Sequence, residues 1–451
     1  MASPTAARLG LGTLLIALSA LYVAGAMRHG AQVNVSRARA DQSGYLWDAV
    51  GIYQDRQTGT DRLIGERNRM PVYPWLLSWL YDPAMSPDQF FEKVKRWNTG
   101  FSLLLLAVIG VVVRRLLPPL PALNLLLVVA FGYFVFKAPY AQVELLFYTV
   151  WFLMFVACWL ALTSTGRKAI VFGLLAGLLA ALAHLSKAAV LPFAGLFIAV
   201  SAVRAAGSLL PAARAGRRLV GEVLVPVVFA VAVLAVLSPY LLNSKRVFGH
   251  YFYNVNSTFY VWYDDWPAAS QGTYQHGDGV GWPKMPASEI PTMRTYLRGH
   301  SAGQIATRIK DGLEEMVVVS YNRLWYCKYV ALYLAFAAVL VASRGRSVAA
   351  VLSEQPALTG FLVLYGATYL LAVAFYKPIS GTTLRMLLTH VLPLLFAFSR
   401  AFAHPRLSRT EWTVAGSLVT PMHFQGFVLL TVLFDAAFSI WPRLMSDFAG
   451  Y

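Results

Sequence analysis

Residues 145–162, LLFYTVWFLMFVACWLAL, form an apolar stretch without a single charged side chain. A stretch of this length can cross the hydrocarbon core of a bilayer as one helix. Similar stretches recur along most of the 451-residue chain, in which 58% of the residues are hydrophobic. Only 13% are charged, against roughly 25% in soluble domains. The sequence therefore predicts an all-α polytopic membrane protein and excludes a soluble globule.

The hydropathy pattern places about eleven such helices along the chain. Their approximate ranges are 9–27, 98–113, 118–136, 140–162, 169–186, 188–206, 219–241, 326–343, 355–375, 384–402 and 418–440. We interpret 9–27 as a retained helix, because it is longer than a signal-peptide core of roughly 7–15 residues. No internal repeat or low-complexity linker divides the sequence, so residues 1–451 are predicted to form a single integral membrane domain.

Basic residues predict how these helices are oriented. The turns on one side hold Arg114, Arg115, Arg167, Lys168, Arg204, Arg214, Arg217, Arg218, Arg344, Arg346, Arg400, Arg406 and Arg409. The positive-inside rule assigns this side and the amino terminus to the cytoplasm. The anionic cytoplasmic leaflet then accounts for the net charge of +17, and nucleic acid is excluded as a partner. The Ala-, Leu- and Arg-rich composition indicates the inner (plasma) membrane of a bacterium.

Two long segments, 28–97 and 242–325, fall on the opposite, extracytoplasmic side and hold most of the acidic residues. We expect both to contain amphipathic helices at the membrane interface. In the first segment, one helical face collects Leu46, Trp47, Ala49, Val50 and Tyr53. A second helix is predicted to begin near Pro71, and a third after Ser86, where Gln89 completes a capping box.

Several short motifs occur in the same order as in a known family. They are Asp41 with Tyr45 and Ala49, the segment Arg69-Met70-Pro71-Val72-Tyr73-Pro74, Glu144, Lys187, the segment Asn243-Ser244-Lys245-Arg246-Val247-Phe248-Gly249, and Arg385. In this order and topology the chain resembles the GT-C glycosyltransferases, most closely the branch of the protein O-mannosyltransferases and aminoarabinose transferases. One departure is Gln42, because that branch often has an Asp-Glu pair where this chain has Asp41-Gln42.

The resemblance implies a GT-C-like helix bundle with an inverting glycosyltransferase activity. In that family a sugar moves from a polyprenyl-phosphate donor to an acceptor on the extracytoplasmic face. The acceptor class stays open between protein, lipid and polysaccharide, and membrane lipids are further expected partners. No cofactor is required if basic side chains hold the phosphate. A divalent metal also stays open, although the sequence offers no cluster of metal ligands.

Sugar transfer needs a base for the acceptor hydroxyl, and the resemblance indicates Asp41. The alternative role of Asp41 is a helix N-cap, which Asp and Asn fill about equally well. Transfer also needs cations at the departing phosphate, and the candidates are Arg67, Arg69, Lys187 and Arg385. The alternatives are solvated loop positions for the two first-segment arginines and snorkelling from a helix end for Lys187.

Three further residues are candidates for supporting this site. Glu144 is a lone acid at the mouth of a span, where a charge is costly and therefore indicates function. The alternative is a simple ion pair with Lys137 or an arginine. Tyr45 and Tyr73 belong to the family-like motifs. Asp48 and Asp55, seven residues apart on the helix that Asp41 precedes, are expected to be solvated.

The second outer segment is rich in aromatic rings. Tyr260, Trp262 and Trp266 are candidates for stacking on a sugar or covering an acceptor. The alternative is an aromatic belt that packs the segment on the membrane surface. His276 and Asp278 stand beside three glycines and predict a mobile turn rather than a metal site.

Two other functions compete with sugar transfer. An O-antigen ligase or polymerase also has many spans and a large outer loop, but such enzymes lack an acidic loop directly after the first helix. A lipid or glycolipid transporter usually has repeated halves and polar helices at mid-membrane, whereas polar residues here gather on one side. The sequence therefore favours a membrane glycosyltransferase.

Overall fold

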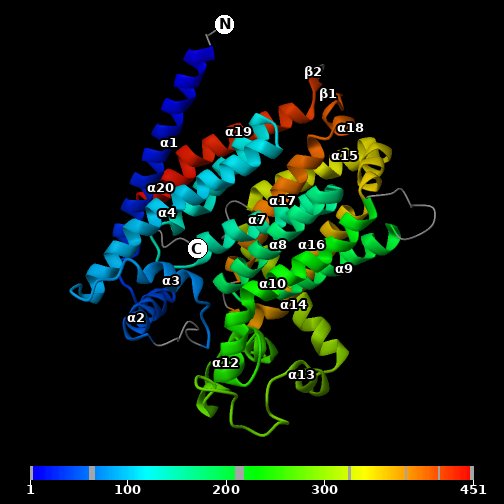
Figure 1. Ribbon diagram of the computed structural model, residues 1–451. Coiled ribbons are helices and arrows are strands. Elements are labelled where there is room, and N and C mark those ends of the chain that lie inside the picture. Colours follow the sequence, from blue (N-terminus) through cyan, green and yellow to red (C-terminus); the bar gives the residue numbers. More distant parts are fainter. Residues whose placement is uncertain are drawn as a thin grey trace.

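The chain folds almost entirely into helices (Figure 1). The computed structural model describes residues 4–59, 67–208, 218–322, 327–380, 383–414 and 417–446. The elements are α1 (Pro4–Val33), α2 (Gln42–Thr58), α3 (Val72–Ser78), α4 (Pro87–Leu116), α5 (Pro119–Val129), η1 (Ala130–Phe134), α6 (Val135–Lys137), α7 (Glu144–Thr163), α8 (Gly166–Ser186), α9 (Leu191–Ser208), α10 (Arg218–Phe248), α11 (Val255–Thr258), η3 (Tyr260–Trp262), α12 (Trp266–Gln271), η4 (Tyr274–His276), α13 (Met293–Gly299), α14 (Ala302–Asn322), α15 (Cys327–Glu354), α16 (Pro356–Ser380), α17 (Thr383–Phe402), α18 (Pro405–Ser408), β1 (Trp412–Val414), β2 (Ser417–Val419), α19 (Pro421–Asp435), η5 (Ala436–Ile440) and α20 (Trp441–Leu444).

Within the described ranges, nine helices are long and apolar enough to cross a membrane. They are α4, the continuous run from α5 to α6, α7, α8, α9, α10, α15, α16, and the run from α19 to α20. Helices α1 and α17 occupy the positions of the first and tenth expected spans, and the apolar part of α17, Met386–Phe402, is shorter than the others. The prediction of an all-α integral membrane protein is confirmed in this respect.

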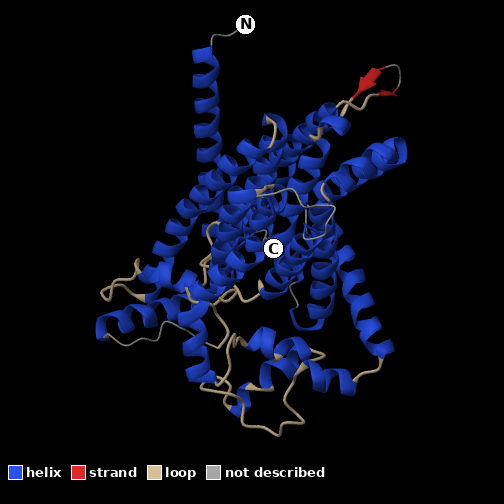
Figure 2. Ribbon diagram, turned by 45° about the vertical axis from the view of Figure 1, so that its right-hand side comes forward, coloured by secondary structure: helices blue, strands red, loops and turns tan. Residues whose placement is uncertain are grey.

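The two ends of the bundle differ in kind. Figure 1 shows α2, α3, α12 and α13 together at its lower end, opposite the amino terminus, α18 and the small β1–β2 hairpin. Figure 2 shows the same separation after rotation, with most of the irregular backbone at the lower end. At the upper end, arginines of the basic turns close the helix termini. Arg204 donates to Leu162 O at 2.7 Å and pairs with Glu222 at 3.0 Å, while Arg400 donates to Leu116 O at 2.6 Å.

Helix α7 is the most buried of the nine candidate spans. Its Trp151 is fully buried and meets the rings of Phe193, Tyr369 and His390 edge-on, with centroids 5.2 to 5.5 Å apart. Edge-to-face ring pairs of this kind are stabilising beyond the area they bury. Because α7 is central, the residues at its first turn, including Glu144, are fixed by surrounding helices.

Helices α8 and α10 approach each other closely because glycine replaces a larger side chain at their contact. A Cβ at Gly177 would lie 2.5 Å from Phe229 O and 2.8 Å from Ala232 Cβ. Small residues allow such close backbone approach between membrane helices. Helix α8 is thereby held in place, and its carboxyl end carries Lys187 to the lower end of the bundle.

The helices predicted in the first outer segment are present. Helix α4 begins at Pro87 with the expected capping box, in which Ser86 Oγ accepts from Gln89 N and Gln89 Oε1 accepts from Ser86 N. The expected face of α2 was wrong at Trp47, which is 76% exposed, and also at Asp48, which is buried rather than solvated. Asp48 takes the inner face because an arginine pairs with it there, and this turns Trp47 outward.

The second outer segment, 242–325, is more helical than a simple loop. Helix α10 continues to Phe248, and the amphipathic α14 packs along α16, where Glu315 pairs with Lys377 at 2.9 Å. The segment also contains a small apolar core of its own, built around Phe248, Tyr253 and Phe259. It is therefore a folded layer on the lower end of the bundle.

Candidate functional site

The backbone before α2 is bent by two consecutive left-handed residues, Ala40 (φ 55°) and Asp41 (φ 67°). This conformation costs about 1–2 kcal/mol per non-glycine residue, so the surrounding structure must hold it. The side-chain amide of Gln142 donates to Ala40 O, and Gln42 Oε1 accepts from Ala141 N at 2.8 Å. The short segment before α7 thus fixes the entry to α2.

Asp41 is exposed, and its side chain makes no capping hydrogen bond to α2. Only its carbonyl serves the first turn, accepting from Gly44 N at 3.1 Å and from Tyr45 N at 3.3 Å. The geometry therefore does not support the N-cap interpretation. Asp41 therefore presents an exposed side chain at the entry to α2 that does not cap the helix.

Arg69 lies against the same face of α2. Its Nε donates to Asp48 Oδ2 at 2.8 Å, and both side chains are largely buried. The guanidinium lies over Gly44, where any Cβ would overlap it, and 5.9 Å from the ring centroid of Tyr45. Asp41 immediately precedes α2, and its carbonyl accepts from Gly44 N and Tyr45 N, the two residues against which the Arg69 guanidinium lies.

Tyr45 and Tyr73 connect this face to α7. Their rings meet edge-on with centroids 5.4 Å apart, and the Tyr73 hydroxyl donates to Asn98 Oδ1 at 3.3 Å. Burial raises the pKa of the Tyr73 phenol well above its usual range, and the negative charge of Glu144 raises it further. Tyr73 is therefore a neutral hydroxyl packed beside Glu144.

Glu144, at the first turn of α7, is 2% exposed. Its Oε1 lies 3.9 Å from Lys187 Nζ, and Lys187 is 29% exposed in its side chain. The expected partner Lys137 instead lies over the ring of Tyr140 at 4.7 Å. The pair of Glu144 and Lys187 thus brings a partly accessible cation next to the tyrosines of the site.

Six of the predicted site residues therefore form one connected group at the lower end of the bundle, which Asp41 joins through its carbonyl oxygen: Asp41, Tyr45, Arg69, Tyr73, Glu144 and Lys187. We call them the acid–base cluster. It combines an exposed carboxylate with two cations, each already balanced by a buried acid. Such an arrangement can accept a proton at one point and stabilise an added anion at another.

Arg67 is not part of this cluster, contrary to expectation. Its guanidinium pairs with Asp278 Oδ2 at 3.0 Å and donates to the Tyr260 hydroxyl at 2.8 and 3.0 Å. It also lies 4.8 Å from the ring centroid of Tyr274. These contacts tie Arg67 to the second outer segment, and its role at the phosphate stays a prediction.

The three rings proposed for sugar stacking have different environments. Tyr260 is 3% exposed and meets Trp266 edge-on, and burial raises the pKa of its phenol. Trp262 packs on Tyr296 and Phe375 of α16. Trp266 is 50% exposed and presents the most accessible ring of the three, while Trp262 is half-buried. The stacking role is wrong for Tyr260 because its ring is covered.

Asp278 is the residue that the sequence interpretation most clearly misplaced. It lies in a turn, as predicted, but its side chain is fully buried. Tyr253, whose hydroxyl donates to Asp278 O at 2.8 Å, packs over it. The sequence does show that Asp278 lies in a segment rich in aromatic residues, and an acid buried among such residues needs a basic partner. The sequence does not show that this partner is Arg67.

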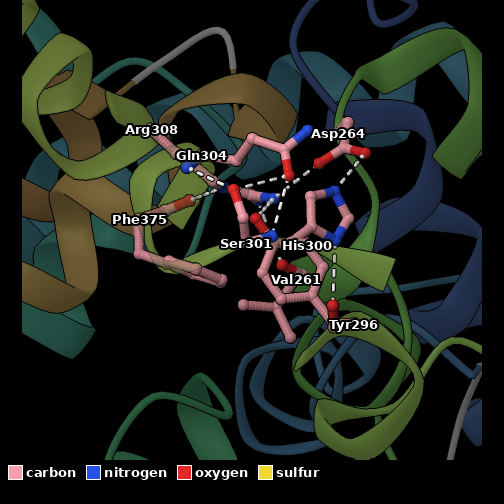
Figure 3. Close-up of polar contacts among 8 residues, drawn as sticks. All are labelled: Val261, Asp264, Tyr296, His300, Ser301, Gln304, Arg308 and Phe375. Carbon is pink, nitrogen blue, oxygen red and sulfur yellow. Dashed lines mark hydrogen bonds and ion pairs between the residues drawn. The ribbon is translucent and has the colours of Figure 1, made fainter. Parts of the chain in front are cut away.

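A second polar cluster fastens the second outer segment to α16 (Figure 3). Arg308 donates to Phe375 O at 2.8 Å, to Asp264 Oδ1 at 3.2 Å and to the Tyr296 hydroxyl at 3.1 Å. His300 contacts the other carboxylate oxygen of Asp264 at 3.0 Å. This cluster is an anchor, because each polar group in it is directed at another part of the same segment or at α16.

Arg385 belongs to α17, but its side chain lies outside the described residues. Its role at the phosphate stays a prediction. Among the described residues, no group of three or more His, Cys, Asp and Glu side chains is arranged to hold a metal ion.

Comparison with known proteins found no matching family model, no matching curated protein and no matching solved structure. The acid–base cluster therefore has to be interpreted from its own chemistry.

Proposed function

We propose that this integral membrane protein transfers a sugar from a polyprenyl-phosphate donor to an acceptor on the extracytoplasmic face of a bacterial inner membrane. The observation that carries the proposal is the acid–base cluster, in which Asp41 is exposed, Arg69 lies over Gly44 in the turn that follows Asp41, and Lys187 pairs with Glu144. The resemblance of the motifs to GT-C glycosyltransferases supports the same reaction class.

In the proposed reaction, the acceptor hydroxyl loses its proton to the Asp41 carboxylate as its oxygen bonds to the anomeric carbon. The bond from that carbon to the phosphate oxygen breaks, and the configuration inverts. Polyprenyl phosphate leaves with the bonding electron pair. Arg69 and Lys187 supply positive charge where this negative charge grows, with Tyr45 and Tyr73 packed between them.

This mechanism needs no cofactor, because side chains provide both the base and the cations. The lipid tail of the donor would remain in the membrane beside the bundle, while its phosphate reaches the lower end. The acceptor, whether protein, lipid or polysaccharide, would approach from the side of the exposed Asp41 and Trp266.

The bound lipid tests the proposal. Native mass spectrometry of the purified protein should show a polyprenyl phosphate or its sugar conjugate. In Lys187→Ala the loss of a charge-assisted contact should weaken binding by roughly tenfold or more. Lys284→Ala is the control, because Lys284 is an exposed lysine of the second outer segment outside the acid–base cluster. Wild-type protein that retains only bulk phospholipid, even after addition of polyprenyl phosphate, would contradict the proposal.

A further inference from the structure

The first and second outer segments are joined at one short stretch, residues 67–70. Arg67 O accepts from Val255 N at 2.9 Å, and Asn68 O accepts from the side chain of Asn254 at 2.7 Å. The Arg67 side chain adds its bonds to Asp278 and Tyr260. Both the backbone and the side chains of this stretch are therefore held by the second outer segment.

The Asp278 carboxylate depends on Arg67. Its side chain is fully buried, its Oδ2 pairs with Arg67, and its Oδ1 has no hydrogen-bond partner among the described residues. A buried carboxylate needs a compensating charge, so Asp278 fixes the Arg67 guanidinium strongly. Two residues further along the chain, Arg69 pairs with Asp48 and lies over Gly44.

We propose that Arg67, Asp278 and Tyr260 are positioning residues, which hold the 67–70 stretch so that Arg69 is presented to the donor phosphate. This inference rests on the proposed function for the identity of the ligand, but not for the position of Arg69. The second outer segment is fastened independently to α16 through Arg308, so it can act as a fixed support for this stretch. The acid–base cluster is thus completed from outside the first segment.

The test compares two acid-to-amide variants of the second outer segment. Asp278→Asn removes the charge that holds Arg67, while the control Asp264→Asn removes an acid that contacts Arg308 and leaves in place both residues 67–70 and the bond from Arg308 to Phe375 O. The first measurement, which needs no donor, is the rate at which phenylglyoxal modifies Arg69, followed by peptide mass spectrometry. We expect this rate to rise several-fold in Asp278→Asn and to stay at the wild-type value in Asp264→Asn.

The second measurement is the affinity for polyprenyl phosphate, which should fall about tenfold in Asp278→Asn and stay unchanged in Asp264→Asn. If Asp278→Asn does not fold, Tyr260→Phe replaces it, because it removes one acceptor of Arg67 and keeps the ring. Unchanged Arg69 modification, or equal acceleration in the control, would overturn the positioning role. Faster Arg69 modification with unchanged affinity would overturn its link to the donor. A wild-type protein without affinity for polyprenyl phosphate would instead remove the proposed function, while Arg69 modification would still decide the positioning role.

Discussion

Asp41 differs from the acids inside α2 because its backbone is left-handed and its side chain is exposed. On either side of it, Ala40 O accepts from the side chain of Gln142, and the side chain of Gln42 accepts from Ala141 N. The left-handed backbone at Asp41 is strained, and such strain often accompanies functional sites. If Asp41 is the base, its charge is required; if it has only a structural role, its shape is sufficient.

Asp41→Asn separates these two roles, because the amide keeps the shape of the side chain but cannot accept the proton of the acceptor hydroxyl. We expect normal expression, normal binding of polyprenyl phosphate, and sugar transfer reduced by roughly 10²-fold or more. Asp55→Asn, on the same helix but outside the acid–base cluster, should transfer sugar at the wild-type rate. Near-normal transfer by Asp41→Asn in an assay with a labelled donor would remove Asp41 as the base and make Glu144 the next candidate.

The ion-pair partners of single residues could not be predicted from the sequence. Arg67 and Arg69 are both outer arginines two positions apart, and nothing in the sequence separates them. Only the fold places Asp48 beside one and Asp278 beside the other. Glu144 and Lys187 were recognised individually, but their pairing depends on how α7 packs against the end of α8. That these residues lie toward one end of the bundle was predictable from the sequence, whereas the partners that they find in distant segments were not.

Helix α2 and the stretch 67–70 pack closely because α2 has a glycine, Gly44, at their contact. Gly44 leaves room for the Arg69 guanidinium, whereas nothing lies within 4 Å of a Cβ placed at Gly51 of the same helix. Capping signals and apolar periods had predicted where α3 and α4 begin. The apolar period also predicted the inward face of α2 at Leu46 and Ala49, which are buried, but not the burial of Asp48, which depends on its ion pair with Arg69.

Gly44→Ala and Gly51→Ala should therefore separate helix stability from function. Either change makes α2 intrinsically more stable, by roughly 0.5–1 kcal/mol. Gly44→Ala should nevertheless displace Arg69 and weaken binding of polyprenyl phosphate by about tenfold, whereas Gly51→Ala should bind normally. Thermal unfolding and lipid binding, measured on both variants, check this. Equal affinities in the two variants would show that Arg69 does not contact the donor.

At the scale of the whole molecule, the basic turns and the acid–base cluster lie at opposite ends of one bundle (Figure 1). Hydropathy was sufficient to locate most of the apolar helices, because a helix that crosses the hydrocarbon core must itself be long and apolar. The folded layer formed by the second outer segment was less predictable, since its order comes from Arg67 and Arg308 contacting distant parts of the chain. The function proposed here requires that this layer face outward.

Cysteine labelling of intact cells tests that requirement, in a background in which Cys158 and Cys327 are replaced by alanine. Gln275→Cys, at an exposed site in η4, should react with a membrane-impermeant maleimide. Leu418→Cys, at a 61% exposed position of β2, should react only after permeabilisation, because the hairpin lies with the basic turns. Position 60, in the first outer segment, is a second candidate for labelling from outside the cell, but it lies outside the described residues. The reverse pattern would put Asp41 and Lys187 in the cytoplasm, and transfer from a donor presented on the outer face would then be impossible.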